Sequence, residues 1–205
     1  MKTSNKKRII RLCESAVMLS AGVVLGFVKL FDLPYGGSVT LCSMLPIIII
    51  SYRYGTFWGL GCGFVFSIIQ LLLGIKSLSF ATSAGAVTAI IFLDYIVAFS
   101  VLGLGGIYKK IIKNQILSLS LGTFTVGILR LFCHIISGCT VWAGLSIPSK
   151  DAFVYSVIYN AGYMLPEMAV TLIAAILISA SVELGGEKLK LKNAKNKLKK
   201  SKTSK

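Results

Sequence analysis

Acidic residues are scarce in this chain. Seven Asp and Glu stand against 22 Lys and Arg among 205 residues, and there is a single histidine. Charged residues make up only 14% of the sequence, whereas hydrophobic residues make up 55% and the mean hydropathy is +0.81. A soluble domain of this size could not enclose so much apolar surface. The composition therefore excludes a soluble protein and predicts an integral membrane protein.

Recognisable catalytic and metal-binding motifs are also missing. The five cysteines lie in apolar segments without CxxC or paired-histidine spacing, so neither a disulfide framework nor a metal site is indicated. The sequence contains no Walker lysine with its glycine-rich loop and no Ser-His-Asp arrangement. We expect no enzyme and no bound cofactor, and any ATP hydrolysis would have to come from other polypeptides.

The basic residues gather at the two ends of the chain and in short segments between apolar runs. A nucleic-acid-binding protein would spread them over a folded surface, so this distribution indicates membrane topology instead. We therefore expect a lipid bilayer, and no nucleic acid, as a partner.

Hydropathy predicts six membrane-spanning helices. About 20 residues cross the ~30 Å hydrocarbon layer. Because the second span is short and contains Pro46, it is tilted, broken or partly re-entrant. No stretch outside the spans is long enough for a second domain, so we predict an all-α membrane protein with one six-helix domain over residues 10–182. The predicted spans are 10–31, 38–53, 55–74, 84–108, 116–139 and 152–182.

The basic segments predict the orientation of these helices. Residues 1–9 form a basic N-terminus, and residues 183–205 form a lysine-rich tail that we expect to be disordered. Arg53 lies between the second and third spans, and further lysines lie between the fourth and fifth. An even number of spans places all of these on one side, which the positive-inside rule makes the cytoplasm. Both termini are therefore predicted to be cytoplasmic.

Polar side chains lie deep in the last three spans, where burying an ionisable group in lipid is costly. With a helical rise of ~1.5 Å per residue, Asp94, His134 and Asn160 lie roughly 8–15 Å below the outer helix ends. Arg130 shares the helical face of His134, and Glu167 shares that of Asn160. These depths predict that the side chains meet in a cavity that opens outward.

Aromatic residues flank this predicted cavity. Trp142 and Tyr155 lie near the loop between the last two spans, at a membrane interface where aromatic residues also occur without any ligand. Among the deep ionisable groups, two carboxylates and one guanidinium leave one negative charge when the histidine is neutral. A small cationic, aromatic ligand is therefore predicted.

Each deep polar residue also has a structural interpretation. Arg130 either contacts ligand or pairs with one of the two carboxylates, and His134 alone would be interpreted as a packing residue. Because Glu167 follows Pro166, we interpret it as satisfying backbone groups freed at a helix kink. Asn160 could instead make a hydrogen bond between helices.

Four ordered segments carry a resemblance to a known family. They are 34–39 (PYGGSV), 93–98 (LDYIVA), Leu129 and Arg130 with 134–138 (HIISG), and Tyr155 and Ser156 with 159–161 (YNA). In this order they resemble the thiamine-specific substrate-binding subunit, or S component, of the energy-coupling-factor (ECF) transporters. The similarity runs from about residue 10 to about residue 180 and so covers nearly the whole membrane region.

The resemblance implies a six-helix S-component fold that binds thiamine from outside. Asp94 occupies the family's acidic ligand position, while His134 and Trp142 match the residues that bracket the thiazolium ring. The remaining matches are Tyr95 beside the acidic position, Arg130 one turn before the histidine, and Tyr155 and Asn160 as polar contacts to the ligand.

The first outer loop departs from the family pattern. Some relatives have a tryptophan after the Tyr-Gly pair, whereas this chain has Gly37, so we do not expect an aromatic contact from this loop. Gly37 would instead let the backbone approach the ligand or let the loop act as a lid.

The first span carries a second feature of the family. Ala16 and Ser20 form a small-xxx-small pair, which lets another helix approach closely in lipid. The resemblance implies that this pair docks the S component on the transmembrane T subunit. Packing within the chain is the alternative.

The function implied by the resemblance is high-affinity thiamine uptake across a bacterial plasma membrane, energised by a T subunit and two ATPase subunits. Three alternatives stay open from the sequence. The chain could be an S component for another vitamin or pyrimidine, a proton-coupled secondary transporter, or an intramembrane enzyme that uses Asp94 with His134.

Overall fold

The computed structural model describes residues 2–144, 151–186 and 189–191. Within these ranges, five helices are long and apolar enough to cross a membrane, and a sixth apolar helix is shorter. The predicted class of helical membrane protein is therefore confirmed. The five long helices are Asn5–Phe27, Thr56–Leu73, Ala84–Lys110, Gln115–Trp142 and Ala152–Ser181, and the short one is Leu45–Tyr54.

The described part of the chain forms five regular helices and one irregular helix. The regular helices are α1 (Lys2–Phe27), α2 (Leu45–Tyr54), α3 (Thr56–Leu73), α6 (Gln115–Trp142) and α7 (Ala152–Ser181). After the 3-10 turn η2 (Ile75–Phe80), the fourth span changes its helical type repeatedly along its length. It consists of α4 (Ala84–Ala89), the π-helical η3 (Ile90–Val97), α5 (Ala98–Ser100), η4 (Val101–Leu104) and η5 (Ile107–Lys110).

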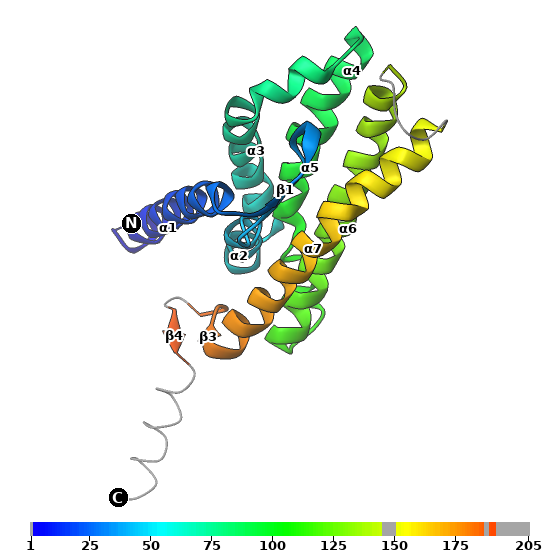
Figure 1. Cartoon of the computed structure of the whole chain (residues 1–205). Coiled ribbons are helices and arrows are strands. Elements are labelled where there is room, and N and C mark those ends of the chain that lie inside the picture. The colour runs from blue at the N-terminus through cyan, green and yellow to red at the C-terminus, as the bar shows by residue number, and fades with distance from the viewer. Residues whose placement is uncertain (1, 145–150, 187–188, 192–205) are drawn as a thin grey trace, which may run out of the picture.

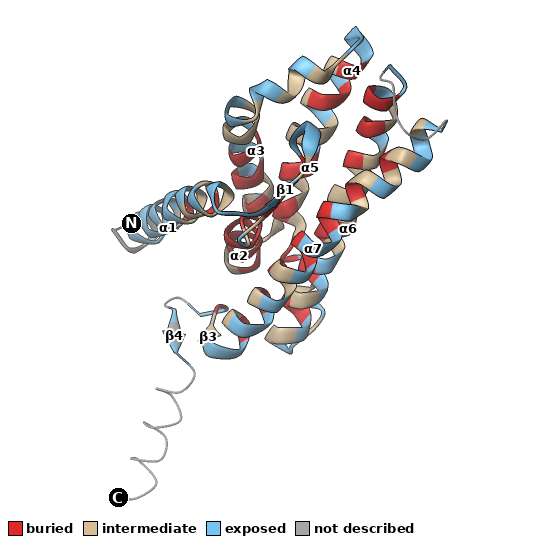
Figure 2. Cartoon of the chain, in the orientation of Figure 1, coloured by how far each residue is buried: buried red, intermediate tan, exposed pale blue. Residues whose placement is uncertain are grey.

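The helices form a bundle from which α1 projects to one side. α6 and α7 lie side by side along their length, and α2, α3 and α5 lie between them and α1 (Figure 1). The surface of α1 is largely exposed, with 11% of its apolar window buried (Figure 2). Much of this helix is therefore available to lipid or to a partner.

The predicted second span is wrong in its first part. Ser38–Thr40 is the strand β2, which pairs antiparallel with β1 (Lys29–Asp32), and the helix begins only at Leu45. The short turn η1 (Pro34–Gly36) joins the two strands, and we call residues 29–40 the hairpin. The first span also ends earlier than predicted, at Phe27 rather than at residue 31, because β1 follows.

Helix α2 is short and is surrounded by protein. Eight of its ten residues are buried, and Ile47 and Ile48 have no exposed surface. It packs in the main core with Phe66 and Leu102, from α3 and η4. A helix that is apolar on all sides and enclosed by others is a core helix. Hydropathy alone does not separate burial in protein from burial in lipid, so the sequence did not reveal that protein encloses this segment.

The backbones of α3 and η4 approach each other closely at glycines. A Cβ atom on Gly103 would lie 2.3 Å from the backbone of Gly59 and Leu60. We expect Gly103→Ala to lower stability by about 1–3 kcal/mol, because the two segments would have to separate. Thermal melting in detergent measures this. In the matched variant Gly61→Ala the new methyl group meets open space, so equal melting temperatures for the two variants would contradict the prediction.

One end of the bundle is held together by a basic side chain. Arg53 pairs with Glu14 of α1 at 2.9 Å, and its Nη1 donates to the carbonyl of Leu184. The Nζ of Lys109 donates to the Arg53 carbonyl. These contacts bring α1, the α2–α3 turn, η5 and the chain after α7 to one end of the bundle. Beyond α7, β3 (Val182–Glu183) pairs with β4 (Lys190–Leu191), and residues 187–188 and 192–205 of the lysine-rich tail lie outside the described residues.

Candidate functional site

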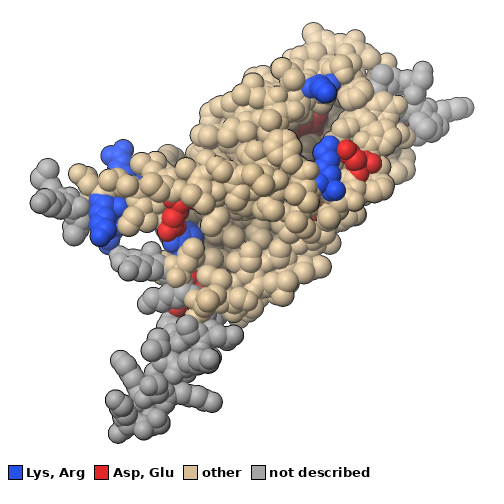
Figure 3. Space-filling view, turned by 60° about the vertical axis from the view of Figure 1, so that its left-hand side comes forward, with Lys and Arg blue, Asp and Glu red and all other residues tan. Residues whose placement is uncertain are grey.

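A cavity of about 620 Å³ lies between the hairpin, α1, α3, η3, α6 and α7. Its volume is within the ~300–1,000 Å³ that is usual for small-molecule sites. The surface is hollowed on this face, with acidic atoms recessed in the hollow and basic atoms around it (Figure 3). The charged residues that line the cavity are Lys29, Asp32, Lys76, Asp94, Arg130 and Glu167.

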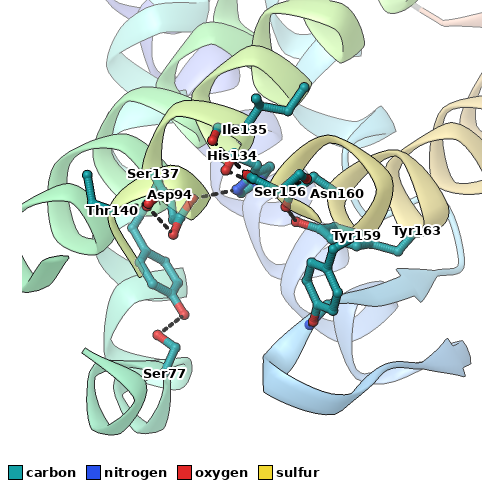
Figure 4. A network of polar contacts seen from close by, with 12 residues as sticks. Ser77, Asp94, His134, Ile135, Ser137, Thr140, Ser156, Tyr159, Asn160 and Tyr163 are labelled. Carbon is teal, nitrogen blue, oxygen red and sulfur yellow. Dashed lines mark hydrogen bonds and ion pairs between the residues drawn. The ribbon is translucent and has the colours of Figure 1, made fainter. Parts of the chain in front are cut away.

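Asp94 lies on the π-helical stretch η3 and is held by two side chains of α6. His134 Nδ1 is 2.8 Å from Asp94 Oδ1, and Ser137 Oγ donates to Oδ2 at 2.7 Å (Figure 4). A carboxylate only accepts hydrogen bonds, so Nδ1 is the protonated nitrogen of the ring. These two hydrogen bonds fix the orientation of the Asp94 carboxylate. Because the side chain is 24% exposed, it remains accessible from the cavity. The predicted meeting of Asp94 and His134 is confirmed.

Asn160 joins α7 to α6. Its Nδ2 donates to the carbonyl of His134 at 3.1 Å and to that of Ser156 at 2.9 Å, while its Oδ1 accepts from Tyr163 (Figure 4). The hydrogen bond between helices that the sequence allowed is therefore present. Asn160 also lines the cavity, so the same amide that fixes the helix pair forms part of the wall.

Arg130 does not form the ion pair that was one of its two interpretations. Neither Asp94 nor Glu167 lies within salt-bridge distance of its guanidinium, and its Nε and Nη1 have no hydrogen-bond partner among the described residues. The guanidinium carbon instead lies 4.3 Å from the centre of the Phe99 ring, on the cavity wall. The His134 Nε2 likewise has no partner within the described part of the chain.

Glu167 binds the hairpin, so its interpretation as the acceptor for a kink in its own helix is wrong. Its Oε1 accepts from the hydroxyl of Thr40 at 2.6 Å and lies 3.5 Å from that of Ser43. Its Oε2 accepts from the backbone N–H of Thr40. Helix α7 continues through Pro166. This partner lies 127 residues away in the sequence, which is why local reasoning missed it.

The aromatic side chains at the mouth of the cavity lie on helices. Trp142 is the last residue of α6 and is 4% exposed, and Tyr155 lies in the first turn of α7, so both lie at the helix ends next to the connection between α6 and α7. The ring centres of Trp142 and Tyr155 are 4.8 Å apart. Trp142 lines the cavity, whereas Tyr155 packs against Trp142 and is not among the described lining residues.

Tyr95 also lines the cavity. Its ring stacks on Phe99 with centres 6.2 Å apart. Its hydroxyl donates to the carbonyl of Gly74 and contacts the Ser77 hydroxyl, each at 2.9 Å. These contacts hold the ring of Tyr95 against the cavity wall. Tyr95 directly follows Asp94 in the sequence.

The hairpin does bring an aromatic ring to the cavity, contrary to our expectation for this loop. Tyr35 has a φ of 68°, and its ring centre lies 5.0 Å from that of Trp142 and 5.4 Å from that of Phe80. Gly37 donates its backbone N–H to the Tyr159 hydroxyl at 3.0 Å. A Cβ atom at Gly37 would lie 2.7 Å from the ring of Tyr163, so only glycine allows this close approach.

Tyr159 was missed by the sequence reasoning, although a signal was present. Tyr155, Tyr159 and Tyr163 recur every four residues and therefore share a face of α7 with Asn160.

Ala16 and Ser20 both lie on the exposed surface of α1, where the Ser20 hydroxyl donates to the Ala16 carbonyl at 3.0 Å. These two residues therefore do not pack against another described helix, which was the alternative to a docking surface.

Apolar helices around a cavity with a recessed carboxylate, a histidine and aromatic walls define a membrane protein that binds a small molecule. The sequence model of the thiamine transporter protein (Thia_YuaJ) family matches residues 12–184. The chain belongs to this family. It is thus a transport protein rather than an enzyme, and a multi-pass protein of the bacterial plasma membrane.

Two relatives named thiamine transporter ThiT share most of their length with this chain. The protein from Bacillus subtilis (strain 168) is 30% identical over 186 residues, covering 85% of this chain and 93% of the relative. The protein from Lacticaseibacillus paracasei is 24% identical over 195 residues, covering 87% and 91%. A solved structure of ThiT from Listeria monocytogenes has a TM-score of 0.69 at 22% identity, covering 84% and 94%, which confirms the predicted fold.

Proposed function

We propose that this chain binds thiamine in the cavity between the hairpin, η3, α6 and α7, as the S component of an ECF transporter. The observation that carries the proposal is Asp94, a carboxylate recessed in a cavity walled by aromatic rings. Thiamine combines a permanent cation with two flat rings, which such a site accommodates. Membership of the thiamine transporter family supports the same ligand.

The charges deep in the cavity agree with a cationic ligand. Of the charged lining residues, Lys29, Asp32 and Lys76 are exposed to solvent. The remaining Asp94, Glu167 and Arg130 give one net negative charge when His134 is neutral, and a bound monocation would balance it. Arg130 and His134 retain nitrogen atoms without partners among the described residues, so both can also contact ligand. The proposed contacts are Asp94, Tyr95, Arg130, His134, Trp142, Asn160 and the backbone at Gly37, with Tyr155 supporting Trp142.

We expect energy for uptake to come from separate subunits. A T subunit would dock on α1 near Ala16 and Ser20, whose exposure supports this, and two ATPases would bind the T subunit. Both termini would face the cytoplasm. The contacts of Arg53 support a common side for the basic segments, because they gather these segments at one end of the bundle.

Isothermal titration of the purified chain with thiamine tests the ligand. We expect one thiamine per chain and a higher melting temperature in its presence. A neutral pyrimidine should compete poorly, because it lacks the cation. If thiamine gives neither heat nor thermal protection while another vitamin gives both, the ligand assignment is wrong.

Uptake into vesicles tests the energy source. We expect no accumulation of thiamine in vesicles that contain only this chain, with or without a proton gradient. Accumulation should require a T subunit, the ATPases and ATP. Gradient-driven accumulation by the chain alone would instead establish a secondary transporter.

A further inference from the structure

One face of α7 holds the second strand of the hairpin at three successive points. The three side chains of α7 are spaced four residues apart, so they form a single stripe along the helix. Each contacts a residue of the segment 37–40, and the contacts follow the same order along the helix and along the segment. The pairs are Tyr159 with Gly37 by a hydrogen bond, Tyr163 with Val39 by apolar packing, and Glu167 with Thr40 by hydrogen bonds.

The spacing of helix and strand makes this match possible. Eight residues of helix rise about 12 Å, and three steps along a strand span about 10 Å. The segment therefore runs alongside α7 with one contact per helical turn. Sliding the strand by one residue would turn Val39 away from Tyr163, so the contacts at the two ends of the stripe fix its register.

The contact at Glu167 is the strongest of the three. Glu167 is 2% exposed, and both of its oxygens accept hydrogen bonds from Thr40. Hydrogen bonds to an ionised, buried acceptor are stronger than neutral ones. The contact at the other end is made by a neutral hydroxyl, that of the half-buried Tyr159, which accepts from the backbone N–H of Gly37 and donates to the carbonyl of Pro34. The hairpin is thus anchored chiefly at its base.

The rest of the hairpin is held to the helices by neutral contacts. All four residues of β1 are exposed. Tyr35, at the tip, contacts the rings of Trp142, Phe80 and Tyr159, and the Tyr159 hydroxyl donates to the carbonyl of the neighbouring Pro34. The place of Tyr35 over Trp142 therefore depends on the register of the hairpin along α7, and the contact of Thr40 with Glu167 is the charged anchor of that register.

We propose that Glu167 is a positioning residue for the binding site: by holding Thr40 it sets the register of the hairpin, which keeps Tyr35 over Trp142 and retains the ligand. The role in retention rests on the proposed function. Because Thr40 occupies both oxygens of Glu167, Asp94 is the carboxylate that serves the ligand directly.

Thr40→Val tests this with little change of shape, since it removes the hydroxyl donor to Glu167 and keeps the branched side chain. The chain has two tryptophans, so in a Trp58→Phe background fluorescence reports Trp142 alone. Without ligand, we expect Thr40→Val to increase quenching of Trp142 by acrylamide, because Tyr35 no longer covers it. With thiamine, we expect the dissociation rate to rise roughly 10- to 100-fold, the effect of losing a hydrogen bond to a charged group.

Thr88→Val is the matched control. The Thr88 hydroxyl donates only to the Ala84 carbonyl, on the exposed surface of α4 and away from the cavity. It should change neither quenching nor dissociation. Thr40→Ser, which keeps the hydroxyl, should recover most of the parent's behaviour. Glu167→Gln should resemble Thr40→Val. The double variant should show little more quenching and little faster dissociation than either single variant, since both changes remove the same interaction.

The outcomes separate this inference from the proposed function. If the parent binds thiamine while Thr40→Val and Glu167→Gln keep the parent's quenching and dissociation rate, the inference is wrong and the proposed function stands. If the variants melt earlier but Trp142 is equally shielded, Glu167 is merely structural, which also overturns it. If the parent does not bind thiamine, the proposed function fails, and quenching of Trp142 still decides whether Glu167 positions the hairpin.

Discussion

The Asp94→Asn protein is expected to bind thiamine about 3–5 kcal/mol more weakly than the parent, a loss of roughly two to three and a half orders of magnitude in Kd. The amide keeps the shape of the side chain but removes the charge that balances the cation. It also disturbs the two hydrogen bonds from His134 and Ser137, because an amide has one acceptor oxygen where the carboxylate has two. The remaining site would then hold an unpaired cation in a largely enclosed cavity.

Isothermal titration with purified protein measures this loss. Asp32→Asn is the matched control, because it makes the same chemical change at the mouth of the cavity. The side chain of Asp32 is 56% exposed and pairs with Lys29 at 2.8 Å. Such exposed pairs contribute about 0–1 kcal/mol, so this variant should lose little affinity. A change below about tenfold for Asp94→Asn would mean that Asp94 is structural, and comparable losses in both variants would indicate a general effect of charge.

The deep polar site could be predicted because helical geometry is regular. Once the ends of the spans were placed, a constant rise per residue put Asp94, His134 and Asn160 at similar depths, and the structure brings them together. The partners of Arg130 and Glu167 could not be predicted in this way. Several arrangements of buried charges have similar energies, and the choice between them depends on which backbone groups lie nearby. For Glu167 that group is Thr40, on a different element.

The hairpin could not be predicted because its pattern is short. Strand β2 has three residues, of which only Val39 is buried, and this is too few to reveal alternation. The position of Tyr35 depends on a positive φ, which propensities do not predict for tyrosine. The π-helical stretch that carries Asp94 likewise has no sequence signal that we recognised. Such stretches are frequent at functional sites, which fits its place in this cavity.

Trp142→Ala is expected to weaken thiamine binding by about 2–4 kcal/mol, the range of a buried aromatic anchor. Trp142 lies at the junction of the hairpin with both long helices, since its ring contacts those of Tyr35, Tyr155 and Tyr159 at 4.8–5.1 Å. Removing it takes away a stacking surface and about 1–2 kcal/mol of cation–π attraction. It also leaves Tyr35 without its main contact, so the mouth of the cavity would open.

Titration of Trp142→Ala and Trp142→Phe tests whether an aromatic ring at this position is what the site needs. Phenylalanine keeps a ring beside the ligand and beside Tyr35, so it should retain a large part of the affinity. Trp58→Phe is the control for the same exchange, because Trp58 packs under Arg11 and donates to Ser15, outside the cavity. It should bind thiamine like the parent. If Trp142→Ala also binds like the parent, Trp142 is only a membrane-interface anchor, and the wall of the site must be sought elsewhere in the cavity.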